Sequence, residues 1–362
     1  MYITPLPPLT PLRRLIHTDK NTVMRQLPGR ALFFERGRQA LMAGIDYLGL
    51  PAGSTVLIPS NICRDVLVPF LLNGILVRYY ARLSNGDIDM DDMLAKLDSS
   101  VSALYLYHYL GMPCPQTDAM IAFARSRNLP VIEDCAHAFL GLQNDQKLGS
   151  FGDIAIFSLW KFMPIPDGGV LIINRDGVTP EQIPVQKTGY PRAALSWSKR
   201  LLKNMSCLRN TAFPDIDRDM GTIEAITNHA PSRLSLSILD HANYPDIRDQ
   251  RVENYAFWFE SLPDFMTPYF DETPSGFCPY AFPFRVKNRD IQRTLYTGMA
   301  ARGIIMEPPI NPNFTGHPMI IDDGLPVNPD CDLVLCLPVY QGLTPAQKRY
   351  ILTALILSLI HI

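Results

Sequence analysis

The sequence predicts an α/β fold: a large domain with a mainly parallel sheet flanked by helices, followed by a smaller C-terminal α+β domain. Apolar runs of strand length alternate with helical periods in the first half of the chain, which is the order of a parallel sheet with helices on both faces. Two such runs, 130–133 and 154–159, lead directly to polar side chains, as strands do at the carboxyl edge of a parallel sheet. The length of 362 residues is sufficient for both domains.

The domain boundaries follow from changes in composition. The beginning of the chain is rich in proline, and we expect an irregular N-terminal arm over 1–30 that wraps across the surface or a neighbouring subunit. Regular periodicity begins after it, so the large domain is expected over 31–236 and the small domain over 237–362.

The first predicted elements are a short aromatic strand and a helix whose apolar face carries residues from Ala40 to Leu48. The turn Arg36-Gly37-Arg38 stands where this helix begins. Free backbone N–H groups and the positive end of the helix dipole make such a turn a seat for phosphate. The two arginines either assist there, because guanidinium binds phosphate well, or merely keep the helix start soluble.

A turn, strand, helix and strand follow over 49–80, and then an acidic helix and a strand that ends at Tyr107-His108. The helix over 118–127 leads into the central stretch. There Asp134 ends one strand, and Ser158 and Lys161 follow another. The Gly-Gly turn at 168–169 starts a third strand that would hold the lysine near one fixed point.

An aspartate at a strand end is more often a turn former, and a lysine there is more often solvated. Together, however, Asp134 and Lys161 suit pyridoxal 5'-phosphate. This cofactor needs an amine to form a Schiff base with its aldehyde, and a carboxylate to keep its pyridine nitrogen protonated. It also needs a cradle for its phosphate.

The segments IEDCAHAFLG, GSFGDIAIFSLWK and PDGGVLI resemble the DegT/DnrJ/EryC1/StrS family of pyridoxal-phosphate-dependent sugar aminotransferases, which have the type I fold of this cofactor class. Weaker matches extend from about residue 31 to the end of the chain. The resemblance implies that the large domain binds the cofactor, with Lys161 and Asp134 as catalytic residues. The other cofactor contacts that it implies are Arg36, Gly37, Arg38, Cys63, His137, Ser158 and Asn228.

These residues have different implied roles. His137 would lie beside the ring hydroxyl, and Ser158 would hold the phosphate. The family's Ser-Gly-Thr turn is replaced around Gly37 by two arginines, and the aromatic residue that stacks on the ring is replaced by Cys63, or alternatively by Asn61 or Ile62.

Asn228 belongs to a turn whose arginine is replaced by Ala230 in this chain. In the family this asparagine reaches the phosphate of the other subunit.

The resemblance implies transfer of an amino group from glutamate to a nucleotide-linked keto sugar, in cell-surface polysaccharide or secondary-metabolite sugar biosynthesis. It also implies a homodimer with shared active sites. Some relatives are dehydratases with histidine in place of the lysine, and Lys161 argues against them. A pyridoxal-phosphate enzyme with a non-sugar substrate and a non-catalytic regulatory relative remain alternatives. A Rossmann-type oxidoreductase lacks its G-x-G-x-x-G motif here, and no histidine spacing supports a metal site.

Bulk properties narrow the class further. The net charge of -2 disfavours a nucleic-acid partner, and the seven cysteines show no paired spacing, which fits a reducing compartment. The start of the chain does not resemble a secretory signal, so a cytoplasmic protein is expected. The apolar run 350–362 is too short to span a bilayer, and Thr344 and Pro345 predict the cap and first turn of a buried helix. The basic and aromatic stretch 186–210 is either a lid or a solvated helix.

Overall fold

The computed structural model describes residues 3–4, 6–7, 22–175, 198, 223, 225–264, 266–306, 317–321, 323 and 333–358. Nearly all of the predicted lid lies outside these residues. Within them the α/β prediction is confirmed, because the largest sheet has eight strands and is mainly parallel. In spatial order its strands are β1 (Arg30–Phe34), β9 (Gly169–Ile173), β8 (Ile154–Ser158), β5 (Val131–Asp134), β4 (Val101–Tyr107), β2 (Thr55–Pro59), β3 (Leu76–Tyr80) and β12 (Ile320–Ile321).

Every pairing from β8 across to β12 is parallel, and β9 is antiparallel to both of its neighbours. The strand-turn-strand corner predicted around Lys161 is therefore the β8–β9 corner. The helices are α1 (Gly37–Leu48), α2 (Arg64–Leu72), α3 (Met90–Ala95), α4 (Thr117–Ser126), α6 (Arg233–Asp240), α7 (Tyr244–Ser261), α8 (Arg289–Ala301) and α10 (Pro345–Leu357). Short 3-10 turns occur at Val23–Arg25, Tyr109–Gly111 and Leu159–Lys161, and β6 (Leu142–Gln143) pairs with β7 (Gln146–Lys147).

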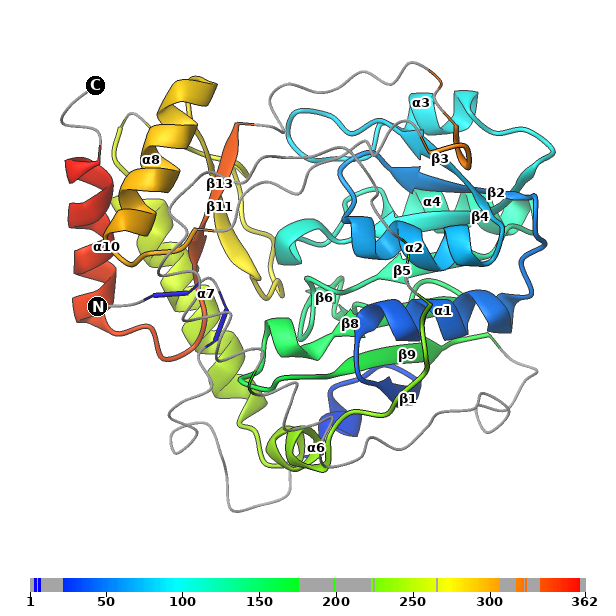
Figure 1. Cartoon of the computed structure of the whole chain (residues 1–362), viewed down its shortest axis with the longest axis horizontal. Coiled ribbons are helices and arrows are strands. Elements are labelled where there is room, and N and C mark those ends of the chain that lie inside the picture. The colour runs from blue at the N-terminus through cyan, green and yellow to red at the C-terminus, as the bar shows by residue number, and fades with distance from the viewer. Residues whose placement is uncertain are drawn as a thin grey trace.

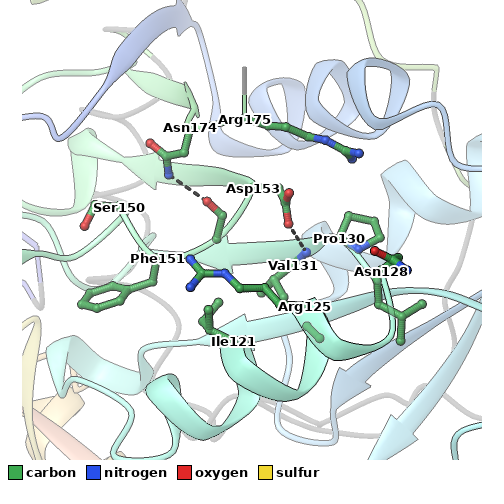
Figure 2. Close-up of a pocket in the computed structure, with 13 residues that line it drawn as sticks. Ile121, Arg125, Asn128, Pro130, Val131, Ser150, Phe151, Asp153, Asn174 and Arg175 are labelled. Atoms are coloured by element: carbon green, nitrogen blue, oxygen red, sulfur yellow. Dashed lines mark hydrogen bonds between the residues drawn. The ribbon is translucent and has the colours of Figure 1, made fainter. Parts of the chain in front are cut away.

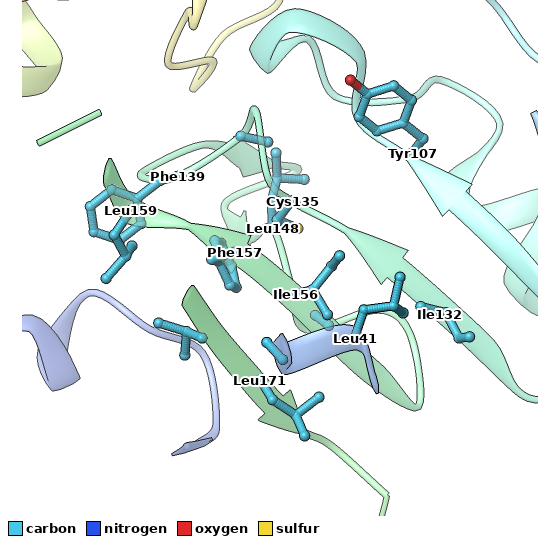
Figure 3. Close-up of a cluster of buried hydrophobic side chains, with 14 of the residues drawn as sticks. Leu41, Tyr107, Ile132, Cys135, Phe139, Leu148, Ile156, Phe157, Leu159 and Leu171 are labelled. Carbon is cyan, nitrogen blue, oxygen red and sulfur yellow. The ribbon is translucent and has the colours of Figure 1, made fainter. Parts of the chain in front are cut away.

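Helices cover both faces of the large sheet, with α1 and α2 on one face and α4 on the other (Figure 1). All residues of β2, β5, β8 and β9 are buried, as expected of strands covered on both sides. Figure 3 shows Leu41 of α1 together with Ile132, Ile156 and Leu171 of three strands in the main core cluster. This packing fixes the carboxyl ends of the strands relative to the start of α1.

The C-terminal part forms a second hydrophobic cluster around a three-stranded antiparallel sheet of β10 (Thr267–Pro268), β11 (Ala281–Arg285) and β13 (Val334–Pro338). Helices α7, α8 and α10 contribute to it (Figure 1). The predicted start of α10 is confirmed, because the Thr344 hydroxyl accepts the Gln347 N–H and Pro345 occupies the first turn. Within the described residues, no helix combines the length and apolar character that crossing a membrane requires.

Two segments pack against parts of the chain that are distant in the sequence. Ile3 of the N-terminal arm does not lie on the surface: it is fully buried in the C-terminal cluster and bridges to Ile304. Strand β12 comes from the C-terminal part of the chain but adds an edge to the large sheet beside β3. Strand β12 satisfies the unpaired N–H and C=O groups at the edge of β3, whereas Ile3 bonds to the backbone of Gly303 and Ile305 after the end of α8.

Candidate active site

The carboxyl ends of three neighbouring strands meet at Lys161. The Nζ of Lys161, which follows β8, lies 2.7 Å from Nε2 of His137, which follows β5. The other ring nitrogen of His137, Nδ1, lies 2.6 Å from the hydroxyl of Tyr107 at the end of β4. Lysine, imidazole and phenol thus form one continuous chain at the edge of the sheet where α/β proteins bind ligands.

Asp134 ends β5 and is almost completely buried. Its Oδ1 accepts the Ala136 N–H at 2.8 Å, and its Oδ2 accepts the Tyr105 hydroxyl at 2.8 Å. Burial raises the pKa of the Asp134 carboxyl, and the bonds from Ala136 and Tyr105 and the nearby charge of Lys161 partly offset that rise. Each oxygen retains a lone pair, so the carboxylate can accept a further N–H from a cationic ring.

His137 is held in an aromatic stack. Its ring lies 4.3 Å from the ring of Tyr280 at an interplanar angle of 8°, and Nζ of Lys161 lies 5.6 Å from the same tyrosine ring. Burial, and secondly the charge of Lys161, lower the pKa of His137 well below its usual value. The imidazole is therefore neutral, with one nitrogen as donor and the other as acceptor.

Gly37 and Ser158 form a cradle at the start of α1. A Cβ on Gly37 would lie 3.6 Å from Oγ of Ser158, so a side chain at residue 37 would fill the space beside this hydroxyl. Ser158 is largely buried, and its hydroxyl has no hydrogen-bond partner among the described residues. Free N–H groups at a helix start and an available hydroxyl fit a phosphate group.

The two arginines that flank Gly37 have contacts within the chain. The guanidinium of Arg36 lies over the ring of Trp160 at 5.3 Å, and burial lowers its pKa. Arg38 lies 3.6 Å from Asp65, in an ion pair whose side chains are both substantially exposed. Their contact with phosphate stays a prediction beside the cradle of Gly37 and Ser158.

The position expected to stack on the ring carries a thiol. Cys63 occupies the N-cap position of α2 without a capping hydrogen bond from its side chain, which is accessible to solvent. Burial nevertheless raises its pKa, and Lys161 and Asp134 are both near enough to affect it, which places the thiol in a recess beside them. Asn61 is 2% exposed, and neither atom of its amide group has a hydrogen-bond partner in the described part of the chain. Ile62 belongs to the core.

Asn228 lies beside the start of α1 of its own chain. The N–H of Glu35 donates to His229 O, and the side chain of Gln39 donates to Thr227 O, so the residues on either side of Asn228 are held there. Its Oδ1 is buried and has no hydrogen-bond partner among the described residues. Its predicted contact with a second subunit stays a prediction.

The model of the DegT/DnrJ/EryC1/StrS aminotransferase family matches residues 30–356. This chain belongs to that family. Protein MosB of Rhizobium meliloti is 32% identical over 142 residues, which cover 39% of this chain and 28% of the relative. GDP-perosamine synthase of Escherichia coli O157:H7 is 27% identical over 148 residues, which cover 38% of each protein. These alignments span less than two fifths of either relative.

Solved structures share the fold over a greater length. Helicobacter pylori PseC, an aminotransferase involved in the biosynthesis of pseudoaminic acid, superposes with a TM-score of 0.71 over 99% of both chains at 15% identity. The PLP-form of the putative sugar aminotransferase Spr1654 from Streptococcus pneumoniae has a TM-score of 0.66 at 16% identity, over 95% of this chain and 92% of that one. The similarity confirms the α/β fold predicted from the sequence.

Four residues that contact the site were not predicted from the sequence of this protein. Tyr105 went unnoticed and Tyr107 was noted only as a strand tip, although their spacing of two on one strand was a visible signal. Tyr280 and Arg251 gave no signal, because they come close to Lys161 only through packing of the C-terminal part.

Arg251 of α7 is a fully buried hub behind the lysine. Its guanidinium donates to Phe162 O at 3.2 Å, to Pro279 O at 2.9 Å and to the side chain of Gln341 at 3.0 Å, and it stacks on the Phe162 ring at 4.5 Å. Burial lowers its pKa to about 10. These bonds tie the segment that carries Lys161 to the C-terminal domain.

A second buried polar network supports the neighbouring loop. His108, Glu133 and Cys135 bring one potential ligand atom each within 4.8 Å of one another. Glu133 already accepts the His108 Nε2–H and the N–H groups of Gly149, Phe151 and Gly152. The cluster is therefore a structural hydrogen-bond centre.

The described part of the chain also forms pockets outside the Lys161 recess, and two of them are considered below. One, of about 350 Å³, is at the amino ends of β5 and β8; Figure 2 shows Asp153 between Arg125 and Arg175 in it. Asp153 accepts the Val131 N–H at 2.8 Å, a structural role.

The other pocket, of about 530 Å³, is lined by residues that include Tyr109 and Phe270. It lies near the site, because the Tyr109 ring is 5.7 Å from that of Tyr107.

Proposed function

We propose that this chain is a pyridoxal-phosphate-dependent aminotransferase that moves an amino group from an amino donor, glutamate, to a nucleotide-linked keto sugar. The observation that carries the proposal is the contact of Lys161 with His137 in a recess that also holds the ionisable, buried Asp134. Relatives that include GDP-perosamine synthase support a nucleotide sugar as acceptor, in polysaccharide or secondary-metabolite sugar biosynthesis.

Each residue has a definite task in this proposal. The cofactor, when bound, supplies an electron sink for the carbanion that forms at the substrate carbon. Lys161 would hold the cofactor at its aldehyde, and its Nζ would move a proton at the substrate carbon. Asp134 holds the N–H of the pyridine ring, and Gly37 and Ser158 hold the phosphate.

Cys63 would lie against the ring in place of an aromatic side chain. Arg36, Arg38 and Asn228 would be further phosphate contacts. Asn228 would act in the site of a partner subunit in a homodimer.

The pocket beside Tyr109 supports a bulky acceptor. Its volume is in the range of ligand sites in proteins, and its lining combines aromatic rings and amide groups with the carboxylates of Asp87, Asp271 and Glu272, which can accept hydrogen bonds from sugar hydroxyl groups. We propose that it receives part of the nucleotide sugar. We also propose a cytoplasmic enzyme, with an arm over 1–30, a cofactor-binding domain over 31–236 and a small domain over 237–362. Free thiols at all five described cysteines are consistent with a reducing compartment.

The test has two stages. Purified protein with added cofactor should absorb visible light, and borohydride should fix the cofactor covalently to the peptide that contains Lys161. Lys161→Ala is the control and should lose both signals. The second stage measures transfer of the amino group from glutamate to each of a panel of nucleotide-linked keto sugars. Transfer to one of them shows that the protein is a catalyst and does not merely bind the cofactor. Covalent attachment at another lysine, or cofactor uptake without transfer to any acceptor, would contradict the proposal.

A further inference from the structure

A tyrosine hydroxyl on β4 binds the buried carboxylate at the end of β5. Tyr105 is fully buried, and its hydroxyl lies 2.8 Å from Oδ2 of Asp134. Strands β4 and β5 are parallel neighbours, and their register places Tyr105 opposite Ile132, two residues before Asp134. The phenol therefore leans along its strand toward the carboxyl edge of the sheet, where the candidate site lies.

The Tyr105 hydroxyl is the donor in this bond. Burial, and then the charge of Asp134, raise the pKa of Tyr105 well above its usual value, so the hydroxyl keeps its hydrogen at neutral pH. Among the described residues, Asp134 is the acceptor of this hydroxyl, and no other is found. An ionised carboxylate can only accept, so the bond satisfies both groups.

Tyr105 is itself held in place. Its ring packs against that of Phe70 of α2 in a T-shaped arrangement, with the ring centroids 6.0 Å apart. Its backbone oxygen accepts the hydroxyl of Tyr80 at 2.7 Å. A buried ring that is fixed on both sides has one place for its hydroxyl, and the carboxylate meets it there.

Asp134 thus has a donor on each oxygen. Oδ1 accepts the Ala136 N–H and Oδ2 accepts the Tyr105 hydroxyl, each at 2.8 Å. The two bonds fix the rotation of the carboxylate group, and both favour its ionised form. Burial acts in the opposite direction and raises the pKa of Asp134, so loss of one donor would make the carboxyl easier to protonate.

We propose that Tyr105 is a positioning residue that aims the carboxylate of Asp134 at the pyridine nitrogen of the cofactor and keeps it ionised at neutral pH. The charge matters because a neutral acid cannot balance a protonated ring nitrogen. The relevance to catalysis rests on the proposed function. The hydrogen bond and its effect on Asp134 do not, and they can be measured without cofactor.

Other ionisable groups face Asp134 from the elements packed against it. They are Lys161 after β8, His108 after β4, Cys63 at the start of α2 and Tyr107 on β4. Each can change the pH response of the site, so the test must read the ionisation of Asp134 directly.

The first experiment titrates Asp134 in the full chain without cofactor. Carbon-13 NMR of protein labelled at the aspartate carboxyl carbons gives the midpoint, and Asp134→Asn identifies the signal. Tyr105→Phe keeps the ring and removes the hydroxyl, so the midpoint should move upward by about one pH unit, because a hydrogen bond to a charged group is lost. An unchanged or lower midpoint would overturn the proposal.

Tyr244→Phe is the matched control. This tyrosine is also buried, but its hydroxyl donates to the backbone oxygen of Leu239 and not to the site. The variant loses one buried hydrogen bond and should leave the midpoint of Asp134 unchanged. An equal upward shift would mean that the titration reports general loosening, and it would overturn the specific role of Tyr105.

The wild type gives a second reading that does not depend on the folding of Tyr105→Phe. Protein labelled with carbon-13 at the hydroxyl-bearing ring carbon of tyrosine should show a signal that titrates with the midpoint of Asp134. The same signal should no longer respond over that pH range in Asp134→Asn. A set of tyrosine signals of which none follows Asp134 would overturn the proposal.

The second experiment measures the dissociation constant for pyridoxal phosphate as a function of pH. Tyr105→Phe should raise it about tenfold near neutral pH, and the pH below which binding weakens should move upward together with the midpoint of Asp134. Asp134→Asn has no charge to titrate at this position, so in that background Tyr105→Phe should leave the pH profile unchanged and weaken binding less than about threefold. A profile that shifts equally in both backgrounds would show that Tyr105 does not act through Asp134. Failure of amino transfer to every acceptor, with the expected titration of Asp134, would refute the proposed function and leave this inference intact.

Discussion

Glu133→Gln should lower the free energy of unfolding strongly, because several buried donors share this one carboxylate. Glu133 is fully buried one residue before Asp134. Its Oε1 accepts the His108 Nε2–H at 3.0 Å and the Gly149 N–H, and its Oε2 accepts the N–H groups of Phe151 at 2.8 Å and Gly152 at 2.9 Å. One carboxylate therefore closes the loop that leads into β8.

The expected change in the free energy of unfolding follows from the number of acceptor oxygens that remain at residue 133. The Cys135 thiol also donates to Oε1, at 3.5 Å. Glutamine keeps one acceptor oxygen and replaces the other with an NH2 group, so at least two of the donors to Glu133 would face another donor. Hydrogen bonds to a charged group contribute about 1.5–3 kcal/mol each, and a buried donor left unpaired carries a further penalty. We expect a loss of about 3–5 kcal/mol in the free energy of unfolding, because about two bonds to a charged acceptor are lost and their buried donors are left unpaired.

The pH dependence supplies an independent check. Burial alone would raise the pKa of Glu133, but the bonds from His108 and the backbone amides outweigh it, so the pKa is lower than its ordinary value of 4.5. A carboxyl with a depressed folded pKa adds stability above the unfolded value, and this stability is lost as the pH falls through the folded value. The wild type should therefore lose stability below about pH 4.5 more steeply than Glu133→Gln.

Urea unfolding of the apoprotein at several pH values measures both effects. Asp153→Asn is the matched control, because Asp153 is less buried and accepts a single backbone N–H there, from Val131 at 2.8 Å. Asparagine can keep that bond, and the loss should stay below about 1 kcal/mol. A Glu133→Gln loss no larger than that of the control, or parallel acid limbs for wild type and variant, would refute the reasoning.

Three further predictions concern the site itself. Asp134→Asn should lower the rate of amino transfer by about 10²–10³ in steady-state assays, because an amide cannot balance a charged ring nitrogen; an unchanged rate would contradict its role. Gly169→Ala should cost about 3 kcal/mol in thermal or urea unfolding, since the new Cβ would lie 2.2 Å from the backbone carbon and oxygen of Arg36; a stability equal to that of the wild type would contradict this close approach. Arg251→Lys should lower the free energy of unfolding by about 2 kcal/mol and weaken cofactor retention, because an ammonium cannot bond to Pro279 O and Phe162 O in the way that the guanidinium does. A variant with the Tm of the wild type would contradict this role of Arg251.

The sequence by itself determined the order of elements and the residues at the strand ends. A strand covered on both faces is apolar throughout, and a polar residue directly after it lies at the carboxyl edge of the sheet. That local rule is sufficient to place Asp134 and Lys161 at one edge and Gly37 at a helix start. It also predicted the capped start of α10, because a cap depends on neighbouring residues alone.

Only the tertiary structure decided which atoms meet. His137 contacts Lys161 and Tyr107 because β4, β5 and β8 lie side by side, and the register of that packing is not written in any one segment. Arg251 reaches the Lys161 segment from a helix ninety residues later, where a charged residue in a helical pattern predicts a solvated position. Such contacts depend on the shapes of surfaces brought together from distant parts of the chain, so local periodicity cannot reveal them.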